Sequence, residues 1–293
     1  MESCLKWIGG KNALSDFITE RMAPHKRYVE VFTGSSIVYL NKSLASINIL
    51  NDFNGNLINL YKVINDERKK NLLQNLLNNI VYSRELFSYF LQIYKNDSSW
   101  IGTNDVTRAL IYLYLNKVSF NGQFKNYATR EDSSNLYILK PILDKMFNKF
   151  QAGKVIFEKL SFEELLLDGK KYRFDEEDTF IYLDPPYWVT TIPGNEYYEK
   201  LMSKHQHENL RDILLSHKKA KWMLSYDNHI EVKKMYGIKE EKKGCFYSSN
   251  ENIYAMLTPE MHQSSASLSD EQVYKEEILI SNYNLESVNT LFE

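Results

Sequence analysis

The chain has 293 residues, of which 43% are hydrophobic and 14% aromatic, and its formal net charge is −2. It contains no apolar run of about 18 residues, so no membrane-spanning helix is expected, and its first residues lack the apolar core of a signal peptide. Cys4 and Cys245 are the only cysteines, which argues against a disulfide framework and against a cysteine-built zinc site. A cytoplasmic protein with a full-sized core is therefore predicted.

Two glycines stand between Trp7 and Lys11 near the N-terminus. Glycine lets a backbone approach a ligand closely, the Trp7 ring can pack on that ligand, and the Lys11 ammonium suits a carboxylate or a phosphate. An ordinary glycine turn leading into a helix explains the same residues, and taken alone it is the better interpretation.

A strand, a glycine loop and a helix are predicted next. Residues 28–32 read as a buried strand, Thr33-Gly34-Ser35-Ser36 form the loop, and a helix follows over residues 37–44. A second strand is predicted over residues 47–50. Strand, glycine loop and helix form the first turn of a nucleotide-binding α/β fold, although one glycine is a weak signal.

Asp52 strengthens this interpretation, because it follows the second predicted strand and lies 18 residues after Gly34. In dinucleotide-binding folds an acid about 20 residues beyond the loop binds ribose hydroxyls. The alternative role for Asp52 is the N-cap of a helix over residues 56–64. We favour the ribose role.

The middle of the chain is basic and helical. Between Tyr61 and Phe150 it contains 13 Lys and Arg against 8 Asp and Glu, whereas the rest of the chain is acidic. Apolar residues recur at helical spacing over residues 72–80, 86–94 and 109–118. Such helices mostly serve packing, and a basic excess of this size is modest evidence for a nucleic-acid partner.

Basic and aromatic residues alternate after the third of these helices, around a tight-turn signal at Asn121-Gly122. Lys and Arg contacts to phosphates, combined with an aromatic wedge, suit a loop that handles DNA. An exposed hairpin without function is the plainer alternative. The residues expected to contact DNA are Lys117, Phe120, Asn121, Gly122, Lys125 and Arg130.

Residues 179–183 predict a short buried strand, and Asp184-Pro185-Pro186-Tyr187 follow it directly. Proline has no N–H for a sheet ladder, so the strand ends at Asp184, at the edge where open α/β sheets bind ligands. The rigid turn offers a carboxylate, backbone carbonyls and the Tyr187 ring, which suit a planar ligand with an NH₂ group, such as a nucleobase. Asp-Pro alone is common in surface turns, but the four residues together are much more specific.

His205 and His207 lie near the start of a helix predicted over residues 205–217, and no third metal ligand lies nearby in the sequence. A step of two residues does not place both rings on one helix face. We therefore expect no metal site and interpret both residues as part of the helix start.

Six motifs in order resemble the DNA adenine methylase (Dam) family of N6-adenine DNA methyltransferases over almost the full chain. They are Lys6-Trp7-Ile8-Gly9-Gly10-Lys11, Glu30-Val31-Phe32-Thr33-Gly34, Asn51-Asp52-Phe53-Asn54, Tyr114-Leu115-Asn116-Lys117 with Phe120-Asn121-Gly122, Asp184-Pro185-Pro186-Tyr187, and Ile278-Leu279-Ile280-Ser281-Asn282-Tyr283. The resemblance implies a Rossmann-like α/β methyltransferase fold with a mainly helical DNA-recognition insert that carries a hairpin. Residues 1–60 and 151–293 would form the catalytic domain, and residues 61–150 the insert.

The resemblance also implies S-adenosyl-L-methionine as the methyl donor and double-stranded DNA as the substrate. The residues expected at the cofactor are Trp7, Gly10, Lys11, Glu30, Phe32, Gly34, Asp52, Phe53 and Asp184. The family usually has a proline where Val31 stands and a second glycine where Ser36 stands, so the chain departs from the family pattern at these two positions.

The expected reaction methylates the N6 amino group of an adenine that has left the duplex, which costs a few kcal/mol. Phe120 and Asn121 would fill or hold the gap, and the base would stack on Tyr187. Asp184 and the Pro185 carbonyl would accept hydrogen bonds from the amino group, so that most of the catalysis is positioning and preorganised electrostatics. Neither a metal nor a covalent enzyme intermediate is needed.

Three alternatives stay open. A cytosine N-4 methyltransferase shares the chemistry, but its motif more often begins with serine than with an aspartate such as Asp184. A protein glutamine methyltransferase typically has asparagine there and needs no basic insert. The departures from the family pattern at Val31 and Ser36 are the reason for the third alternative, a catalytically impaired DNA-binding homologue. A monomer is expected, and the sequence leaves open the recognition site, a cognate restriction endonuclease and a bacterial or phage origin.

Overall fold

The computed structural model describes residues 1–7, 9–96, 100, 102–128, 136–167, 169–188, 202–240, 246–248, 252–259, 261–262, 274–275 and 277–286. The chain divides into two compact units. Unit 1 consists of Met1–Asn12 and Thr33–Lys159, and unit 2 of Ala13–Phe32 and Leu160–Glu293. The predicted insert, residues 61–150, lies within unit 1. Among the described helices, none has both the length and the apolar character needed to cross a membrane.

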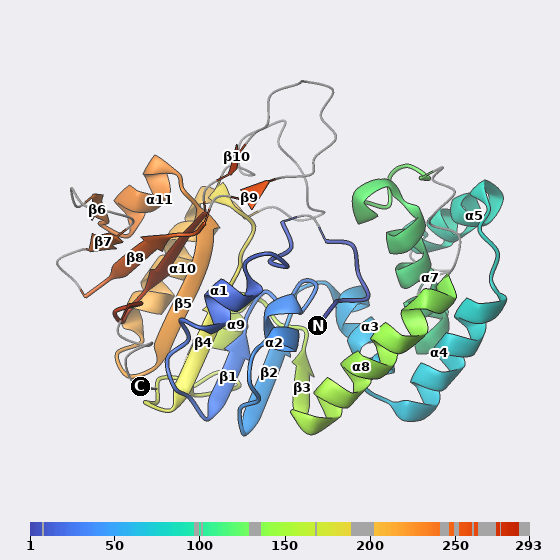
Figure 1. Ribbon diagram of the computed structural model, residues 1–293, viewed down its shortest axis with the longest axis horizontal. Coiled ribbons are helices and arrows are strands. Elements are labelled where there is room, and N and C mark those ends of the chain that lie inside the picture. The colour runs from blue at the N-terminus through green and yellow to red at the C-terminus, as the bar shows by residue number, and fades with distance from the viewer. Residues whose placement is uncertain are drawn as a thin grey trace. The chain divides into compact units, whose positions relative to one another are not determined.

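Unit 1 combines two parallel strands with a group of helices (Figure 1). Its elements are α2 (Ile37–Asn41), β2 (Ile47–Asn51), α3 (Gly55–Ile64), α4 (Glu67–Asn79), α5 (Arg84–Lys95), α7 (Asp105–Val118), η1 (Phe120–Gly122), η3 (Leu136–Ile138), α8 (Leu139–Ala152) and β3 (Val155–Glu158). The three helices predicted for the middle of the chain correspond to α4, α5 and α7, and the strand over residues 47–50 to β2. α2 is shorter than the predicted helix, because the backbone is extended at Lys42.

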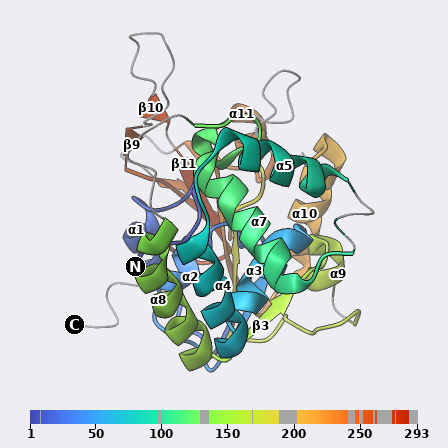
Figure 2. The same cartoon turned by 90° about the vertical axis from the view of Figure 1, so that its right-hand side faces the viewer.

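α7 is the central helix of unit 1. Most of its residues are buried, and it contacts α3, α4 and α5, which Figure 2 shows around it. A helix that is apolar on most faces needs partners on most faces. The end of α7 therefore has a fixed position within unit 1, and the predicted DNA-contacting turn follows directly.

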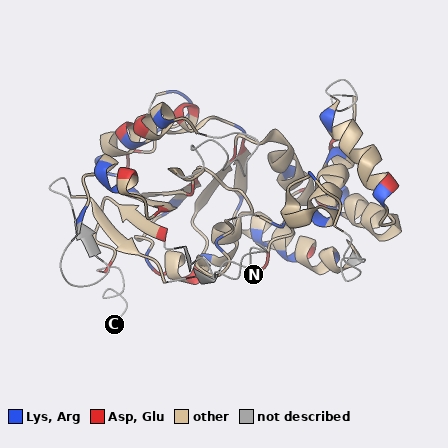
Figure 3. Ribbon diagram, turned by 90° about the horizontal axis from the view of Figure 1, so that it is seen from above, with Lys and Arg blue, Asp and Glu red and all other residues tan. Residues whose placement is uncertain are grey.

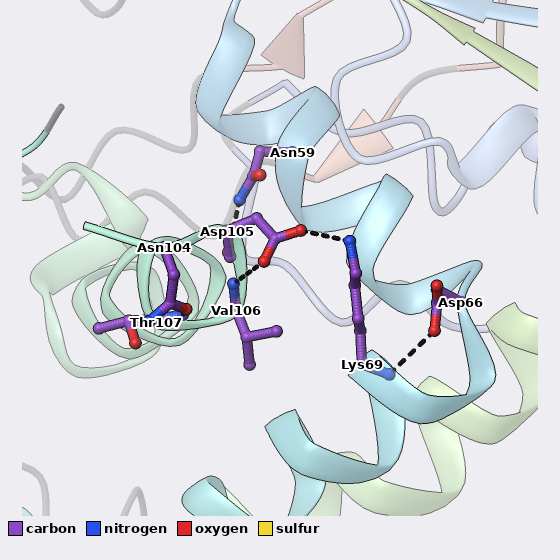
Figure 4. A network of polar contacts seen from close by, with 7 residues as sticks. All are labelled: Asn59, Asp66, Lys69, Asn104, Asp105, Val106 and Thr107. Carbon is purple, nitrogen blue, oxygen red and sulfur yellow. Dashed lines mark hydrogen bonds and ion pairs between the residues drawn. The ribbon is translucent and has the colours of Figure 1, made fainter. Parts of the chain in front are cut away.

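A polar network fixes the start of α7 (Figure 4). The Asn104 side chain accepts the Thr107 N–H at 2.9 Å and caps the helix. Asp105 accepts a hydrogen bond from Lys69 of α4 at 2.5 Å, and its carbonyl accepts one from Asn59 of α3 at 2.9 Å. The Lys69 and Asp105 side chains are 44% and 36% exposed, so this ion pair contributes less than about 1 kcal/mol. The network mainly aligns three helices.

Unit 2 is built on a mixed sheet. Its elements are α1 (Ser15–Thr19), β1 (Arg27–Glu30), α9 (Phe162–Leu166), β4 (Thr179–Leu183), α10 (Lys204–Ser216), β5 (Lys221–Asp227), α11 (Ile230–Met235), β6 (Lys239–Glu240), β7 (Phe246–Ser248), β8 (Tyr254–Leu257), β9 (Met261–His262), β10 (Tyr274–Lys275) and β11 (Glu277–Ser281). In the described part of unit 2 the sheet order is β1-β4-β5-β11-β8-β7-β6, with β9 and β10 paired separately.

The parallel strands of this sheet are β1, β4 and β5, and β11 runs antiparallel between β5 and β8. Every residue of β4 and β11 is buried, as expected for central strands covered on both faces. The predicted strand over residues 179–183 is confirmed, whereas β1 ends at Glu30 rather than at residue 32. The parallel order places the carboxyl ends of β1, β4 and β5 at one edge of the sheet.

Candidate active site

Gly34 forms a tight contact with Trp7 inside unit 1. Its φ is +47°, and a Cβ at this position would lie 2.9 Å from Trp7 Nε1, so the site requires glycine both for its backbone conformation and for space. The Tyr61 hydroxyl donates to the Gly34 carbonyl at 2.5 Å. Gly10 donates its N–H to the Trp7 carbonyl at 3.2 Å. Three predicted cofactor residues are thus brought together.

Asp52 is held by the same loop. Its Oδ2 accepts the Gly34 N–H at 3.0 Å and its Oδ1 accepts the Asn54 N–H at 2.8 Å. Burial raises the pKa of the Asp52 carboxyl, and these two donors act in the opposite direction. The N-cap of α3 is Asn54, whose side chain accepts the N–H groups of Asn56 and Leu57, so the alternative role for Asp52 is wrong. Each carboxylate oxygen keeps a lone pair for a further donor.

Lys11 and Phe53 have opposite surroundings in unit 1. Lys11 is 2% exposed, and its ammonium donates to the Gly9 carbonyl at 3.0 Å. Phe53, directly after Asp52, is 49% exposed. An exposed ring beside the fixed carboxylate is a surface on which a flat group can stack.

Two predicted cofactor residues of unit 2 lie at or just after the end of β1. Glu30 is buried, and its Oε2 accepts a hydrogen bond from the Tyr28 hydroxyl at 2.7 Å. The Phe32 ring lies 6.1 Å from the Phe162 ring between centroids. Both positions are therefore fixed by neighbours in unit 2.

The Asp184 motif lies at the carboxyl edge of the unit 2 sheet, directly after β4. Three other acids lie at this edge, because Glu30 ends β1, and Asp227 ends β5 and is paired with Glu277 at the start of β11. Pro185 is buried, whereas Asp184, Pro186 and Tyr187 keep partial exposure. Fixed φ angles at both prolines stiffen the backbone after the carboxylate.

Burial raises the pKa of the Tyr187 hydroxyl well above its usual value, and the nearby negative charge of Asp184 raises it further. The same two causes act in the same order on Tyr182, one strand position before Leu183. Both phenols are therefore neutral at pH 7, and Tyr187 presents an uncharged ring beside the Asp184 carboxylate.

Aromatic residues from α10 and β5 support this motif, and sequence reasoning missed them. The Tyr187 ring lies 6.0 Å from the Tyr226 ring, and the Trp188 ring lies 5.4 Å from the His207 ring. His207 is buried and its Nδ1 is hydrogen-bonded to the Tyr226 hydroxyl. Burial lowers the pKa of His207 to about 4, so its ring is neutral at pH 7. The Trp188 N–H donates to Asp227 at 3.0 Å.

The predicted turn at Asn121-Gly122 is present. Both residues have positive φ, 52° and 71°, and the Gln123 N–H donates to the Phe120 carbonyl at 3.1 Å, which is the geometry that favours Asn-Gly in hairpins. Ser119 forms an antiparallel bridge with Tyr127. The expected hairpin therefore exists in a short form with a 3₁₀ turn, η1, at its tip.

The predicted DNA contacts differ in accessibility. Phe120 is 47% exposed, and Asn121 and Lys125 are exposed. Lys117 is partly buried, and burial lowers the pKa of its ammonium. Arg130 lies outside the described residues. Figure 3 shows Lys and Arg spread along the helices, so charge alone does not identify a DNA-binding face.

The described residues contain no group of three or more His, Cys, Asp or Glu that could hold a metal ion. Each unit contributes one acid directly after a buried strand, Asp52 beside the glycine loop in unit 1 and Asp184 before Tyr187 in unit 2.

Comparison with known proteins gives a family model and several relatives that are similar to this chain. A family model described as "D12 class N6 adenine-specific DNA methyltransferase" matches residues 7–244. The DNA adenine methylase of Haemophilus influenzae is 26% identical over 258 residues, covering 79% of this chain and 84% of that protein. The DNA adenine methylase of Salmonella typhi is 33% identical over 220 residues, 71% and 74% of the two chains. The DNA N-6-adenine-methyltransferase of Escherichia phage P1 is 32% identical over 120 residues, 41% and 15% of the two chains.

The match to the family model covers most of the chain, and the matched residues include the glycine loop, the Asp52 segment and the turn after β4. The expected resemblance is confirmed, and this chain belongs to the D12 class N6 adenine-specific DNA methyltransferases.

Proposed function

We propose how this chain carries out the reaction of its family, the transfer of a methyl group to the N6 amino group of adenine in DNA. In this proposal the catalytic motif is Asp184-Pro185-Pro186-Tyr187. The observation that carries it is the position of the motif, directly after the buried strand β4 at the carboxyl edge of the sheet.

The methyl donor, S-adenosyl-L-methionine, supplies an electrophilic methyl group on a positively charged sulfur. The residues of unit 1 fit such a ligand, because Asp52 keeps acceptor capacity beyond its two backbone donors and the Phe53 ring that follows it is 49% exposed. Asp52 would accept ribose hydroxyls, and the Trp7 and Phe53 rings would pack on the ligand. Gly10, Lys11, Glu30, Phe32 and Asp184 are the other proposed cofactor contacts.

The adenine amino group is a weak nucleophile, because its lone pair is shared with the ring. The Asp184 carboxylate and the Pro185 carbonyl would accept its two N–H groups and favour a tetrahedral nitrogen. The nitrogen would then form a bond to the methyl carbon as the carbon–sulfur bond breaks, S-adenosylhomocysteine would leave as a neutral thioether, and the methylated nitrogen would lose one proton to solvent. The neutral Tyr187 ring would stack on the base, and because Tyr226 packs against it, the ring does not have to be ordered during the reaction.

The turn at Asn121-Gly122 is the proposed DNA-contacting element, within an insert of residues 61–150. Phe120 is exposed at its tip, where a ring can occupy the space that a flipped base leaves. Gly122 allows the turn, and Lys117, Lys125 and Arg130 would meet phosphates. We further propose that the enzyme acts as a monomer on duplex DNA in the cytoplasm, with or without a cognate restriction endonuclease.

The test is the identity of the methylated nucleoside. Unmethylated duplex DNA is incubated with the protein and labelled S-adenosylmethionine, digested, and analysed by mass spectrometry. We expect N6-methyladenine. N4-methylcytosine would support the cytosine alternative, and a gel shift without any product would support an impaired DNA-binding homologue.

The variant Asp184→Ala tests the proposed role of the carboxylate. We expect it to abolish methylation while the circular dichroism spectrum and thermal midpoint stay close to those of the wild type. Near-normal turnover in this variant would refute the proposed role of Asp184.

A further inference from the structure

Asn116, near the end of α7, is hydrogen-bonded twice to the backbone of one distant residue. Its Oδ1 accepts the Lys6 N–H at 2.8 Å, and its Nδ2 donates to the Lys6 carbonyl at 2.9 Å. Asn116 is 2% exposed, so these bonds form where water competes little for them. The Asn116 side-chain amide thus satisfies both backbone groups of Lys6, as a neighbouring strand would, and it holds the N-terminal segment against α7.

The proposed DNA-contacting turn at Asn121-Gly122 packs against the same pair. A Cβ at Gly122 would lie 2.7 Å from the Lys6 carbonyl oxygen and 2.7 Å from Asn116 Nδ2. The Lys6 ammonium also donates to the Lys117 carbonyl at 2.6 Å. The N-terminal segment, the end of α7 and the turn therefore form one packed piece.

The residue after Lys6 extends this piece to the glycine loop. The Trp7 ring is so close to Gly34 that a Cβ there would lie 2.9 Å from its Nε1, and the Gly34 N–H is bonded to Asp52. A continuous path of contacts thus runs from the turn through Asn116, Lys6 and Trp7 to the Asp52 carboxylate. Every step of this path lies within unit 1.

We propose that Asn116 is a positioning residue that couples DNA binding at the turn to cofactor binding at Trp7 and Gly34. The inference rests on the proposed roles of Trp7, Asn121 and Asp52. A ligand that orders the turn also orders the Lys6–Trp7 segment through the Asn116 amide, so the second ligand loses less conformational entropy on binding. By thermodynamic linkage each ligand strengthens the binding of the other by the same factor.

The test is a ratio of affinities. The dissociation constant of S-adenosylhomocysteine is measured by calorimetry, without DNA and with a saturating duplex that contains the methylation site mapped by sequencing. For the wild type we expect DNA to tighten binding at least about fivefold. For Asn116→Ala we expect a ratio near one. An active fraction lowered by misfolding changes the stoichiometry and leaves this ratio unaltered.

Lys6→Pro tests the same amide from the other side, because proline removes the N–H that Asn116 accepts. Lys6→Ala is its matched control, since it removes the ammonium and keeps that N–H. Lys6→Pro should bring the ratio of the dissociation constants without and with DNA close to one. Lys6→Ala should keep the wild-type ratio. Because Lys6 is exposed in the N-terminal segment, Lys6→Pro decides the question if Asn116→Ala does not fold.

A second control is Asn59→Ala, which removes a side-chain bond to the start of α7 (Figure 4) and should retain the ratio. The inference would be overturned if DNA left the dissociation constant of the wild type unchanged. It would also be overturned if Asn116→Ala or Lys6→Pro kept the wild-type ratio of dissociation constants. Absence of N6-methyladenine from the wild-type reaction would instead overturn the proposed function, so the two failures are distinguishable.

Discussion

Asp52 in unit 1 and Asp184 in unit 2 both follow buried strands, but their surroundings differ. Both oxygens of Asp52 accept backbone N–H groups. Asp184 precedes two prolines, and its charge adds to the effect of burial in raising the pKa of Tyr182 and Tyr187. The two acids therefore occupy similar topological positions in different electrostatic environments.

This difference separates two roles for the same side chain. Backbone donors favour the ionised form of a carboxylate and fix its direction, which suits Asp52 to holding the hydroxyls of a bound ligand. Asp184 follows a sheet edge that carries three other acids, Glu30, Asp227 and Glu277, and such an edge favours a donor such as an amino group over a further acceptor. The predictions below test this division, beginning with the largest expected effect.

Asp184→Asn should lower kcat by about 10²- to 10³-fold, with little change in the affinity for S-adenosylhomocysteine. Asparagine keeps the shape of the side chain but removes the charge. Steady-state methylation kinetics and calorimetry measure the two quantities. If only the affinity fell, the assignment of binding to Asp52 and of chemistry to Asp184 would be wrong.

The stability of unit 2 should depend on pH through His207. Burial lowers its pKa from 6.5 to about 4, so below pH 6.5 the unfolded chain binds a proton that the folded chain does not. Stability is then lost as the pH falls from about 6.5 to about 4, by up to about 3 kcal/mol. Urea unfolding at pH 7 and pH 4 measures this loss.

His207→Gln should remove this part of the pH dependence, whereas His205→Gln, at an exposed position of the same helix, should retain it. Equal pH dependence in the two variants would show that the neutral ring behind Tyr187 is not the cause.

Asp52→Asn should weaken cofactor binding by about 1.5–2 kcal/mol, the contribution of a charge-assisted hydrogen bond. At saturating cofactor we expect kcat close to the wild-type value, in contrast to Asp184→Asn. The measurement is the KM for S-adenosylmethionine together with kcat. A loss confined to kcat would contradict the ribose role.

The smallest expected effect concerns the loop that holds Asp52. Ser36 has φ 56°, which costs a residue with a side chain about 1–2 kcal/mol, and the greater chain entropy of glycine offsets part of this cost. Ser36→Gly should therefore stabilise the protein by about 0.5 kcal/mol in thermal unfolding. Ser35→Gly, at a neighbour without positive φ, should not stabilise it.

The sequence alone determined the elements that depend on local chemistry. Residues 179–183 are apolar and precede two prolines, so both the strand and its end were predictable. The Asn121-Gly122 pair made the turn predictable, because few other residues adopt positive φ at low cost. The family motifs supplied the reaction, since a methyltransferase motif keeps its residue types and order.

Only the tertiary structure decided which distant groups meet. Asn116 is bonded to Lys6, 110 residues earlier, and His207 reaches Tyr226 from another element. Bonds between a side chain and a remote backbone depend on how helices and strands pack, and they leave no periodic pattern in the sequence. The donors around Asp52 and the rings behind Tyr187 were therefore visible only once the chain was folded.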